Sequence, residues 1–594
     1  MASTLEFNQV FHSLERSFGV MIQFDSVFPN ISERSFVPRD ADGGIWEDIE
    51  PFFEDLASRD ISTMETLRQW LLDRSELEAV ISEAVAKRYI SMTIDTSDTE
   101  AEKAYLEMVE NVLPRFDAQV QILDRHYLSS PARSELDEKR YAVLNREVEN
   151  RESLFREENI TLETEDRKLG QRYDKLTGSW SITYEGTEYT LQQAARFLDR
   201  PDRDVRKAVW ELTAECRLED RKTLDDLFNE MVNTRAAIAR NAEFSDYRDF
   251  MFRKRSRFDY GPADCMAYHE AVEQIIVPLL GEITERRKNL LGVERLRPWD
   301  KSADPKGRPA LHPFDDIDTY VTGIRNIFQH IDSEWGEQLD LIHRSGLMDL
   351  ESRKGKAPGG YQYPLEESRL PFIFLHGTGR DANLRVLLHE GGHAFHSLAL
   401  REEPLIWYRD PPLEFCEVAS MSMELLGLDH LSEFYNEEDA ARSIRGELEG
   451  ILETLVWVAH VDAFQHWIYT HPNHTVEERT KQWRVLTDRF EDDYDYSGYD
   501  DVRETLWHRQ GHIFTVPFYY IEYGIAQLGA LQVWLNYKKN KKSSIAALKR
   551  AFGLGGSRPL PELFEAADIR FDFSKETVEP LGRLVREELD RLPD

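Results

Sequence analysis

Two histidines, His389 and His393, stand four residues apart in the segment DANLRVLLHEGGHAFHSL at 381–398. On a helix this spacing places both imidazoles on one face, one turn apart, where they can share one metal ion. Glu390 lies beside them and can reach a water molecule on that metal. The spacing therefore predicts a helix that supplies two metal ligands and a general base.

The same predicted helix carries two adjacent glycines, Gly391 and Gly392. Each is expected to cost roughly 1 kcal/mol relative to alanine inside a helix. Such a pair needs a compensating reason, and we expect a neighbouring segment or the substrate to approach the helix closely there. Thr378 and Asp381, three residues apart, are expected to cap its start.

A second helix is predicted over 413–428, where three glutamates stand among many apolar residues. So much apolar surface implies a mostly buried helix, and buried carboxylates need partners. A zinc ion is such a partner, because two neutral histidines and one carboxylate leave it a position open for water. Of Glu414, Glu417 and Glu424 we choose Glu417 as the third ligand and expect one zinc ion per chain. Glu424, two turns further on, is the candidate for orienting a zinc histidine.

The remaining sequence predicts a mainly α fold with a few short strands. Apolar residues recur at helical spacing through most of the first 170 residues, for example over 65–86. A β-hairpin is predicted over 179–191, where alternating residues flank Glu185-Gly186. With 594 residues, the chain exceeds the roughly 250–300 residues of a single core. We therefore expect two lobes, an N-terminal helical lobe over 1–175 and a catalytic region over 176–594.

Composition excludes several classes of partner. A formal net charge of -36 repels phosphate backbones, so nucleic acid is not expected to bind. No apolar stretch approaches the ~20 residues that span a bilayer, and the first twenty residues lack the pattern of a secretory signal. We therefore expect a cytoplasmic protein without membrane contact; its oligomeric state is not indicated. The three cysteines, Cys216, Cys265 and Cys416, are widely separated and predict neither disulfides nor a cysteine-type zinc site.

These segments resemble the thimet oligopeptidase and oligoendopeptidase F family of zinc peptidases. HEGGHAFH at 389–396 is similar to the family's zinc helix, and EVASMSME at 417–424 to its third-ligand segment. GKAPGGY at 355–361 and PFIFLH at 371–376 resemble its glycine-rich loop and the strand beside its cleft. HIFTVPFYYIEY at 512–523 resembles its C-terminal histidine and tyrosine segment.

The resemblance implies a two-lobed, helical, zincin-like metallopeptidase whose few strands line a deep channel. Such a channel admits short peptides rather than folded proteins. The resemblance also implies that Tyr523 donates a hydrogen bond to the developing oxyanion, with His512 in the same catalytic wall. Tyr520 is implied as a substrate contact, and Gly359 and Gly360 belong to a loop that would bind the peptide main chain by β-type hydrogen bonds.

The function predicted from the sequence is a zinc-dependent oligoendopeptidase acting on internal bonds of short peptides. Zinc activates water, and Glu390 takes its proton and passes it to the leaving amine. A dipeptidyl or metallocarboxypeptidase on the same scaffold is one alternative, and peptides with blocked C-termini would separate it. A catalytically silent peptide-binding protein is another, although binding alone needs no Glu390. A zinc aminopeptidase would require an anchor for the N-terminal amine, which the sequence does not reveal.

Overall fold

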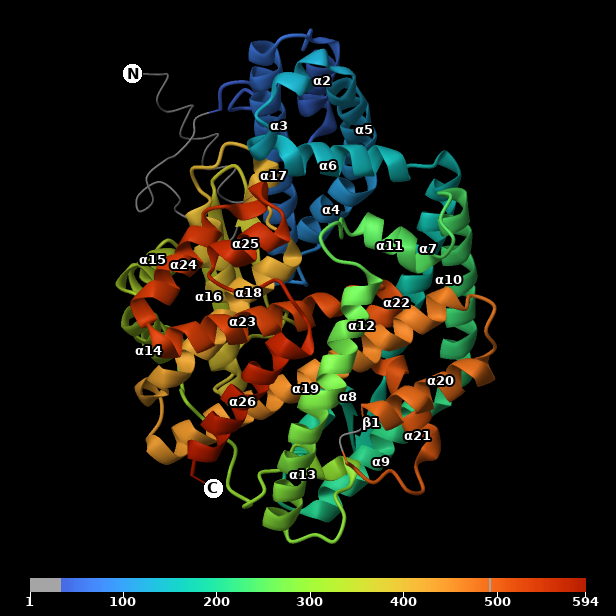
Figure 1. The fold of residues 1–594 in the computed structure, drawn as a ribbon, viewed down its shortest axis with the longest axis vertical. Coiled ribbons are helices and arrows are strands. Elements are labelled where there is room, and N and C mark those ends of the chain that lie inside the picture. Colours follow the sequence, from blue (N-terminus) through green and yellow to red (C-terminus); the bar gives the residue numbers. More distant parts are fainter. Residues whose placement is uncertain (1–33, 491–492, 594) are drawn as a thin grey trace. The chain divides into compact units, whose positions relative to one another are not determined.

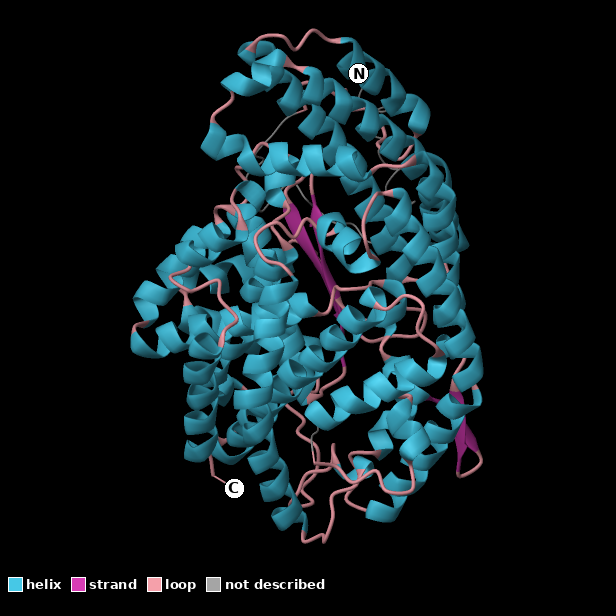
Figure 2. Cartoon of the chain, turned by 45° about the vertical axis from the view of Figure 1, so that its right-hand side comes forward, coloured by secondary structure: helices cyan, strands magenta, loops and turns pink. Residues whose placement is uncertain are grey.

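The computed structural model describes residues 34–490 and 493–593. Helices make up most of this part of the chain, and strands occur there in only two places (Figure 2). The predicted mainly α fold with a few short strands is confirmed. Among the described residues, no helix is long and apolar enough to cross a membrane. The first twenty residues, on which the expectation of no secretory signal rests, lie outside the described part.

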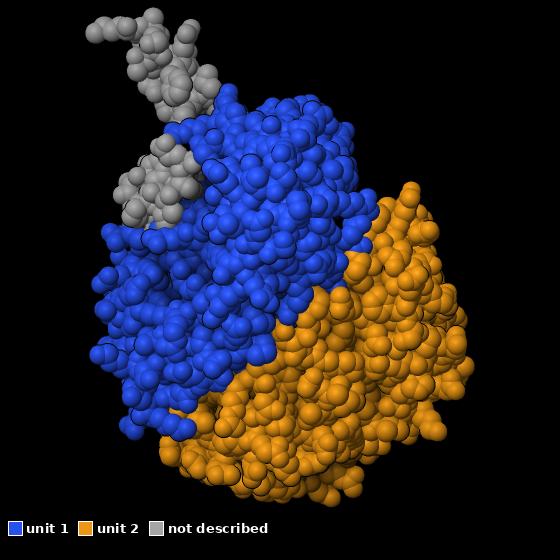
Figure 3. All heavy atoms as spheres, turned by 45° about the horizontal axis from the view of Figure 1, so that its top comes forward, with its two compact units in different colours: residues 1–152, 312–440, 536–569 blue, residues 153–311, 441–535, 570–594 orange. Residues whose placement is uncertain are grey.

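The chain forms two compact units, each assembled from three separate stretches of sequence (Figure 3). Of the described residues, unit 1 contains 34–152, 312–440 and 536–569, and unit 2 contains 153–311, 441–490, 493–535 and 570–593. The units thus alternate along the sequence, whereas the prediction divides the chain once, at residue 175. The division into an N-terminal lobe and a catalytic region, and the substrate channel, stay predictions.

Unit 1 holds most of the helices near the N-terminus (Figure 1), together with a small sheet and the helices that follow it. Its elements are α2 (Trp46–Ser58), α3 (Met64–Ile94), α4 (Thr99–Glu107), α5 (Leu113–Ser129), most of α6 (Glu138–Leu154), α14 (Ile317–Ile331), α15 (Ser333–Arg344), β3 (Met348–Glu351), β4 (Tyr361–Leu365), β5 (Leu370–Gly377), α16 (Asp381–Ala399), α17 (Ile406–Arg409), α18 (Leu413–Gly427), α24 (Lys541–Phe552) and α25 (Leu560–Ala566).

Unit 2 is built from longer helices and one hairpin. Its elements are α7 (Glu157–Gly178), β1 (Ser181–Tyr184), β2 (Thr187–Thr190), α8 (Leu191–Ala194), α9 (Arg203–Glu219), α10 (Arg221–Asn241), α11 (Tyr247–Lys254), α12 (Pro262–Ala271), α13 (Val277–Leu291), most of α19 (Glu437–Thr470), α20 (Val476–Arg489), α21 (Asp500–Glu504), α22 (Gly511–Thr515), most of α23 (Ile521–Lys539) and α26 (Lys575–Arg591). Short 3-10 or π turns complete both units: η1 (Met108–Val112), η2 (Pro131–Glu135), η3 (Ala195–Phe197), η4 (Val272–Ile276), η5 (Pro298–Asp300), η6 (Leu428–Glu433), η7 (Leu506–Arg509) and η8 (Gly555–Ser557).

Two locally encoded elements form as predicted. The segment 65–86, whose apolar residues recur at helical spacing, lies within α3. The hydroxyl of Thr63 caps the start of this helix by accepting a hydrogen bond from Thr66 N at 3.2 Å. The predicted hairpin is the pair β1–β2, with Tyr184 opposite Thr187. Glu185 and Gly186 have φ values of 50° and 78°, and positive φ at both central residues is what a two-residue hairpin turn requires.

In unit 1 a three-stranded sheet leads into the helix that carries the paired histidines. The strand order is β3–β5–β4, with β5 parallel to β3 and antiparallel to β4. The apolar run of β5 is buried, as expected for a central strand. The chain then turns into α16, where Asn383 Oδ1 accepts from Thr378 N and Arg380 N, each at 3.0 Å. The predicted cap by Thr378 and Asp381 was wrong, because Asp381 is already helical and the amide of Asn383 holds the turn.

The paired glycines of α16 are explained by the packing of its neighbours in unit 1. A Cβ on Gly392 would lie 2.6 Å from Ser420 Cα and 2.7 Å from Ala419 O, both backbone atoms of α18. A Cβ on Gly391 would lie 2.7 Å from the ring of Phe328. The expected close approach of a neighbouring segment is therefore confirmed, and it fixes α18 directly against the histidine helix (Figure 1).

Gly392→Ala is expected to destabilise the protein by about 1–2 kcal/mol, because overpacking outweighs the roughly 1 kcal/mol gain in helix propensity. Urea unfolding measures this, with Gly446→Ala as the matched control. Gly446 also lies inside a helix, α19, but a Cβ there meets no atom within 4 Å, so about 0.4–1 kcal/mol of stabilisation is expected. Equal stabilisation by both substitutions would contradict the close packing of α16 on α18.

Candidate metal centre and active site

Helices α16 and α18 bring His389, His393 and Glu417 together at one point of unit 1. His389 Nε2 lies 3.2 Å from His393 Nε2 and 3.3 Å from Glu417 Oε2. His393 Nε2 lies 3.8 Å from Glu417 Oε2. We call these three atoms the donor triad. They form a small triangle of metal-binding atoms from two helices that the glycine contact holds together.

The donor triad fits a zinc ion. Zinc binds imidazole nitrogen and carboxylate oxygen at about 2.0–2.2 Å with tetrahedral angles, which separates neighbouring ligand atoms by about 3.3–3.5 Å. The observed separations of 3.2, 3.3 and 3.8 Å bracket that value. The His389 side chain is 24% exposed and that of Glu417 is 9% exposed, so the site is sheltered but not sealed. Two imidazoles and one carboxylate also form a donor set typical of catalytic zinc.

Two further side chains of α18 fix the orientation of these donors. Glu424 Oε1 lies 2.7 Å from His389 Nδ1, and Ser420 donates its hydroxyl proton to Glu417 Oε2 at 2.9 Å. A proton held on Nδ1 by Glu424 leaves His389 Nε2 with a free lone pair for a metal. Burial disfavours charge on His389, but the hydrogen bonds and charges of Glu417 and Glu424 hold its pKa well above the ordinary value. Metal binding would therefore release a proton.

Glu424→Gln is expected to weaken zinc binding by about 10–100-fold, because the substitution removes the acceptor charge that orients His389. Competition with a chelator of known affinity measures the zinc dissociation constant directly. Glu414→Gln, which removes a carboxylate from the same helix, is the matched control and should leave zinc affinity close to that of wild type. Equal weakening by both substitutions would show that helix charge, and not the contact with His389, sets the affinity.

Glu390 follows His389 on α16 and is buried, with only 7% of its surface exposed. Burial raises its pKa to about 7, and the charge of Glu417 raises the pKa further, while the charge of His389 and a hydrogen bond from the backbone N–H of Gln362 lower it. A carboxyl group with a pKa near neutrality can both accept and return a proton at physiological pH. Its environment therefore suits the general base that the sequence predicts.

The predicted substrate loop lies in unit 1 before the edge strand β4. Gly359 has φ 103°, and a Cβ on Gly360 would lie 2.6 Å from Leu375 Cδ2, so both positions favour glycine. Lys356 Nζ donates to the backbone oxygen of Leu375 at 2.5 Å and ties the loop to β5. The backbone N–H of Gln362 on β4 donates a hydrogen bond to the carboxylate of Glu390. Loop, strand and candidate base thus belong to one connected structure, while the role of the glycines in binding substrate stays a prediction.

The predicted histidine and tyrosines of the C-terminal segment come together in unit 2. We call His512, Tyr519, Tyr520 and Tyr523 the aromatic cluster. The ring of His512 lies 4.9 Å from that of Tyr520 and 6.1 Å from that of Tyr523, and Tyr519 lies 5.3 Å from Tyr523. Burial and the charge of Arg255 lower the pKa of His512, and burial raises that of Tyr520 to about 12. At neutral pH the imidazole is therefore uncharged, and the hydroxyl of Tyr520 keeps its proton.

Three side chains that sequence reasoning missed hold the segment between α22 and α23. Gln465 accepts a hydrogen bond from Phe518 N at 2.7 Å, Arg255 donates to the backbone oxygen of Pro517 at 2.9 Å, and Arg257 donates to that of Phe518. Phe518 itself has φ 61°, a left-handed conformation that is unfavourable for a phenylalanine. These contacts fix the backbone that carries the aromatic cluster. Their partners are far apart in sequence, so no local spacing signals them.

Comparison with known proteins first defines the class: the chain is a peptidase, a hydrolase of peptide bonds. The family model described as Peptidase family M3 matches residues 196–583, and the one described as Peptidase M3 N-terminal domain matches residues 45–155. The chain belongs to peptidase family M3. The resemblance to oligoendopeptidase F noted in the sequence is confirmed.

Individual relatives agree with this assignment. The chain is 22% identical over 465 residues to an oligoendopeptidase F homolog of Borreliella burgdorferi, covering 72% of this chain and 73% of the relative. It is 30% identical over 140 residues to the oligopeptidase PepF of Bacillus subtilis, covering 23% of this chain and 21% of that protein. The solved structure of PZ peptidase A with inhibitor 2 is similar with a TM-score of 0.84 and 30% identity, covering 94% of this chain and 98% of that one.

Proposed function

We propose that this chain is a zinc-dependent oligoendopeptidase that hydrolyses internal bonds of short peptides. The observation that carries the proposal is the donor triad, whose separations suit tetrahedral zinc. Beside it on the same helix lies Glu390, with a pKa of about 7. Family membership supports peptide-bond hydrolysis, and the oligoendopeptidase names of the relatives support internal cleavage. The predicted cytoplasmic location stays a prediction.

The chemistry divides between the metal and the chain. His389, His393 and Glu417 would hold the zinc ion, which would supply Lewis acidity to water and to a peptide carbonyl. Glu390 accepts a proton from the water whose oxygen bonds to the carbonyl carbon. It then delivers that proton to the amine nitrogen as the carbon–nitrogen bond breaks. Glu424 keeps the proton of His389 on Nδ1, so that the lone pair of Nε2 stays available to the metal throughout the reaction.

The aromatic cluster is proposed to stabilise the charge that develops on the carbonyl oxygen. Tyr523 is the proposed hydrogen-bond donor, because the resemblance to the family implies this role for it. His512 lies in the same cluster as an uncharged imidazole, and Tyr520 is the proposed substrate contact. Gly359 and Gly360 are proposed to present backbone groups to the peptide chain.

Tyr523→Phe is expected to lower kcat by about 10²–10³-fold with little change in KM, since the lost hydroxyl acts mainly on the oxyanion. Steady-state kinetics on one fluorogenic peptide measures both constants. Tyr519→Phe is the control, because Tyr519 lies in the same cluster and competes for this role. A larger loss of kcat in Tyr519→Phe than in Tyr523→Phe would transfer the role to Tyr519.

Quenched fluorescent peptides blocked at both ends test the proposal, with products identified by mass spectrometry. Wild type should cut internal bonds, and zinc-loaded Glu390→Gln should not. Cleavage only of peptides with a free C-terminus would support the carboxypeptidase alternative. Peptide binding without cleavage by zinc-loaded wild type would support a silent binding protein instead.

A further inference from the structure

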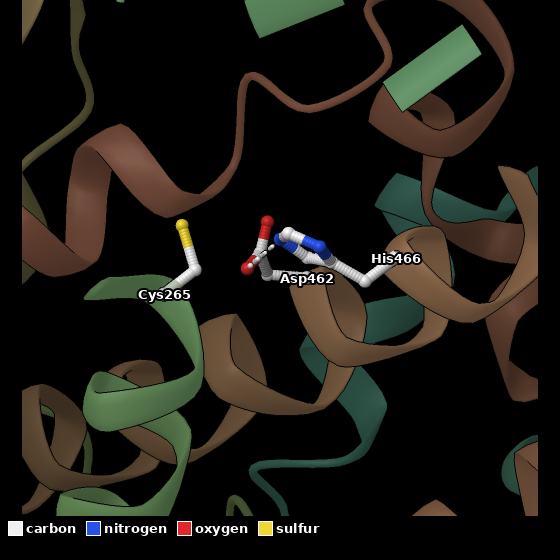
Figure 4. Close-up of side chains that lie close together, drawn as sticks. All are labelled: Cys265, Asp462 and His466. Carbon is white, nitrogen blue, oxygen red and sulfur yellow. Dashed lines mark ion pairs between the residues drawn. The ribbon is translucent and has the colours of Figure 1, made fainter. Parts of the chain in front are cut away.

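Unit 2 contains a second group of side chains of the types that bind metals, and none of them has a role in the proposed reaction. Cys265 and His269 stand four residues apart on α12, and Asp462 and His466 stand four apart on α19. Each pair therefore lies on one face of its helix, one turn apart. We call these four residues the buried polar cluster. Figure 4 shows Asp462 and His466 projecting from one helix toward Cys265 on another.

The cluster is closed off from solvent and short of hydrogen-bond partners. Cys265, His269, Asp462 and His466 are 1%, 0%, 0% and 3% exposed. His269 Nε2 lies 2.8 Å from Asp462 Oδ2, and His466 Nε2 lies 3.3 Å from the same oxygen. Asp462 Oδ1 and the Nδ1 atoms of both histidines have no partner among the described residues. Buried polar atoms without hydrogen-bond partners are costly and rare, and a bound metal ion would satisfy these atoms.

We propose that Cys265, Asp462 and His466 bind a second metal ion, zinc or a related late transition metal, as a structural site inside unit 2. One ligand atom from each of the three residues lies within 4.8 Å of the others. Sulfur, nitrogen and oxygen ligands around tetrahedral zinc are separated by about 3.3–3.7 Å, so a small inward movement of the three side chains would bring their ligand atoms to three of the four tetrahedral positions.

Charge and ligand chemistry support this assignment. A thiolate, a carboxylate and a neutral imidazole carry two negative charges, which a divalent cation would cancel in this buried site. Thiolate and imidazole together favour zinc over magnesium or calcium. His269, hydrogen-bonded to Asp462 Oδ2, fits the position of a residue that orients a metal-binding carboxylate. The ion would bring the metal content to two per chain, where the sequence predicts one.

The two helices of the buried polar cluster also contact the segment that carries the aromatic cluster. The ring of His466 lies 5.4 Å from that of Phe518, and its neighbour Gln465 holds Phe518 N. A Cβ on Gly524 would lie 2.7 Å from the hydroxyl of Tyr268, which neighbours His269 on α12. A metal joining α12 to α19 would therefore brace two helices that contact the segment carrying the aromatic cluster, one at Phe518 and the other at Gly524.

Metal content tests the site without reference to activity. The His389→Ala/His393→Ala chain lacks two of the three atoms of the donor triad, so zinc that it retains is assigned to the buried polar cluster. Mass spectrometry of total metal is expected to find one zinc equivalent in purified samples. Adding Cys265→Ser should remove that equivalent, and adding Cys216→Ser instead should not. A His389→Ala/His393→Ala chain with no bound zinc above the buffer level, even after zinc loading and gel filtration, would overturn the proposal.

A second measurement decides the matter if Cys265→Ser fails to fold. Cobalt is loaded into a His389→Ala/His393→Ala chain that also carries Cys216→Ser and Cys416→Ser, so that Cys265 is its remaining thiol. A thiolate-to-cobalt charge-transfer absorption band is expected. Absence of that band in a folded chain would overturn the assignment of Cys265. Since both tests use chains without the donor triad, their failure leaves the proposed peptidase function untouched.

Discussion

Glu390→Gln is expected to lower kcat/KM by about 10²–10⁴-fold while zinc content stays at the wild-type level. The amide has nearly the shape of the carboxyl group but cannot accept the proton of the attacking water. Because Glu390 is buried and does not belong to the donor triad, the substitution removes a proton acceptor and leaves the metal ligands in place. Peptide cleavage rates and total metal measured on one preparation test both halves of the prediction.

Glu390→Asp is the companion variant for this experiment. It keeps a carboxylate but withdraws it by one methylene group, so an intermediate rate is expected. Near-wild-type cleavage by Glu390→Gln would contradict the role of Glu390 as the base. Loss of zinc in Glu390→Gln would instead show that Glu390 helps to hold the metal.

His393→Ala is expected to weaken zinc binding at the donor triad by about 10²–10⁴-fold, roughly a third of the binding energy of a three-residue site. Peptide cleavage should fall with zinc occupancy and recover in part when zinc is added in excess. Burial and the charge of His389 lower the pKa of His393 to about 4. Its imidazole is therefore neutral above that pH and ready to bind a metal, which makes the substitution costly across the neutral range.

His396→Ala is the matched control, because His396 lies on the same helix three residues further on. Its ring stacks on Phe552 at 4.7 Å, and burial lowers its pKa to about 3. The substitution should reduce stability by loss of packing and leave zinc affinity unchanged. Zinc loss in His396→Ala equal to that in His393→Ala would contradict the choice of donors.

Much of the donor triad could be predicted because its information is local. His389 and His393 are one helical turn apart, and the apolar sequence around Glu417 signals a buried carboxylate in need of a partner. The place of Glu424 two turns further on likewise predicted its contact with a histidine, and it contacts His389 Nδ1. Local periodicity likewise predicted the helix over 65–86 and the hairpin over 179–191.

Features that depend on distant contacts could not be predicted. The two units alternate along the chain, because packing and not sequence order decides which helices share a core. Asn383 replaced the expected cap because the turn after β5 brings three polar groups to its amide. Cys265 and Asp462 are almost 200 residues apart, so only the folded chain shows that they meet.

Zinc restoration tests the central claim most directly. Wild type and the His389→Ala/His393→Ala chain are stripped with a chelator, and cleavage of a doubly blocked quenched peptide is followed as zinc is returned. The account predicts no internal cleavage by either stripped protein, and recovery with added zinc in wild type alone. Internal cleavage by metal-free wild type, or equal recovery in the variant, would contradict a peptidase that works through zinc held by the donor triad.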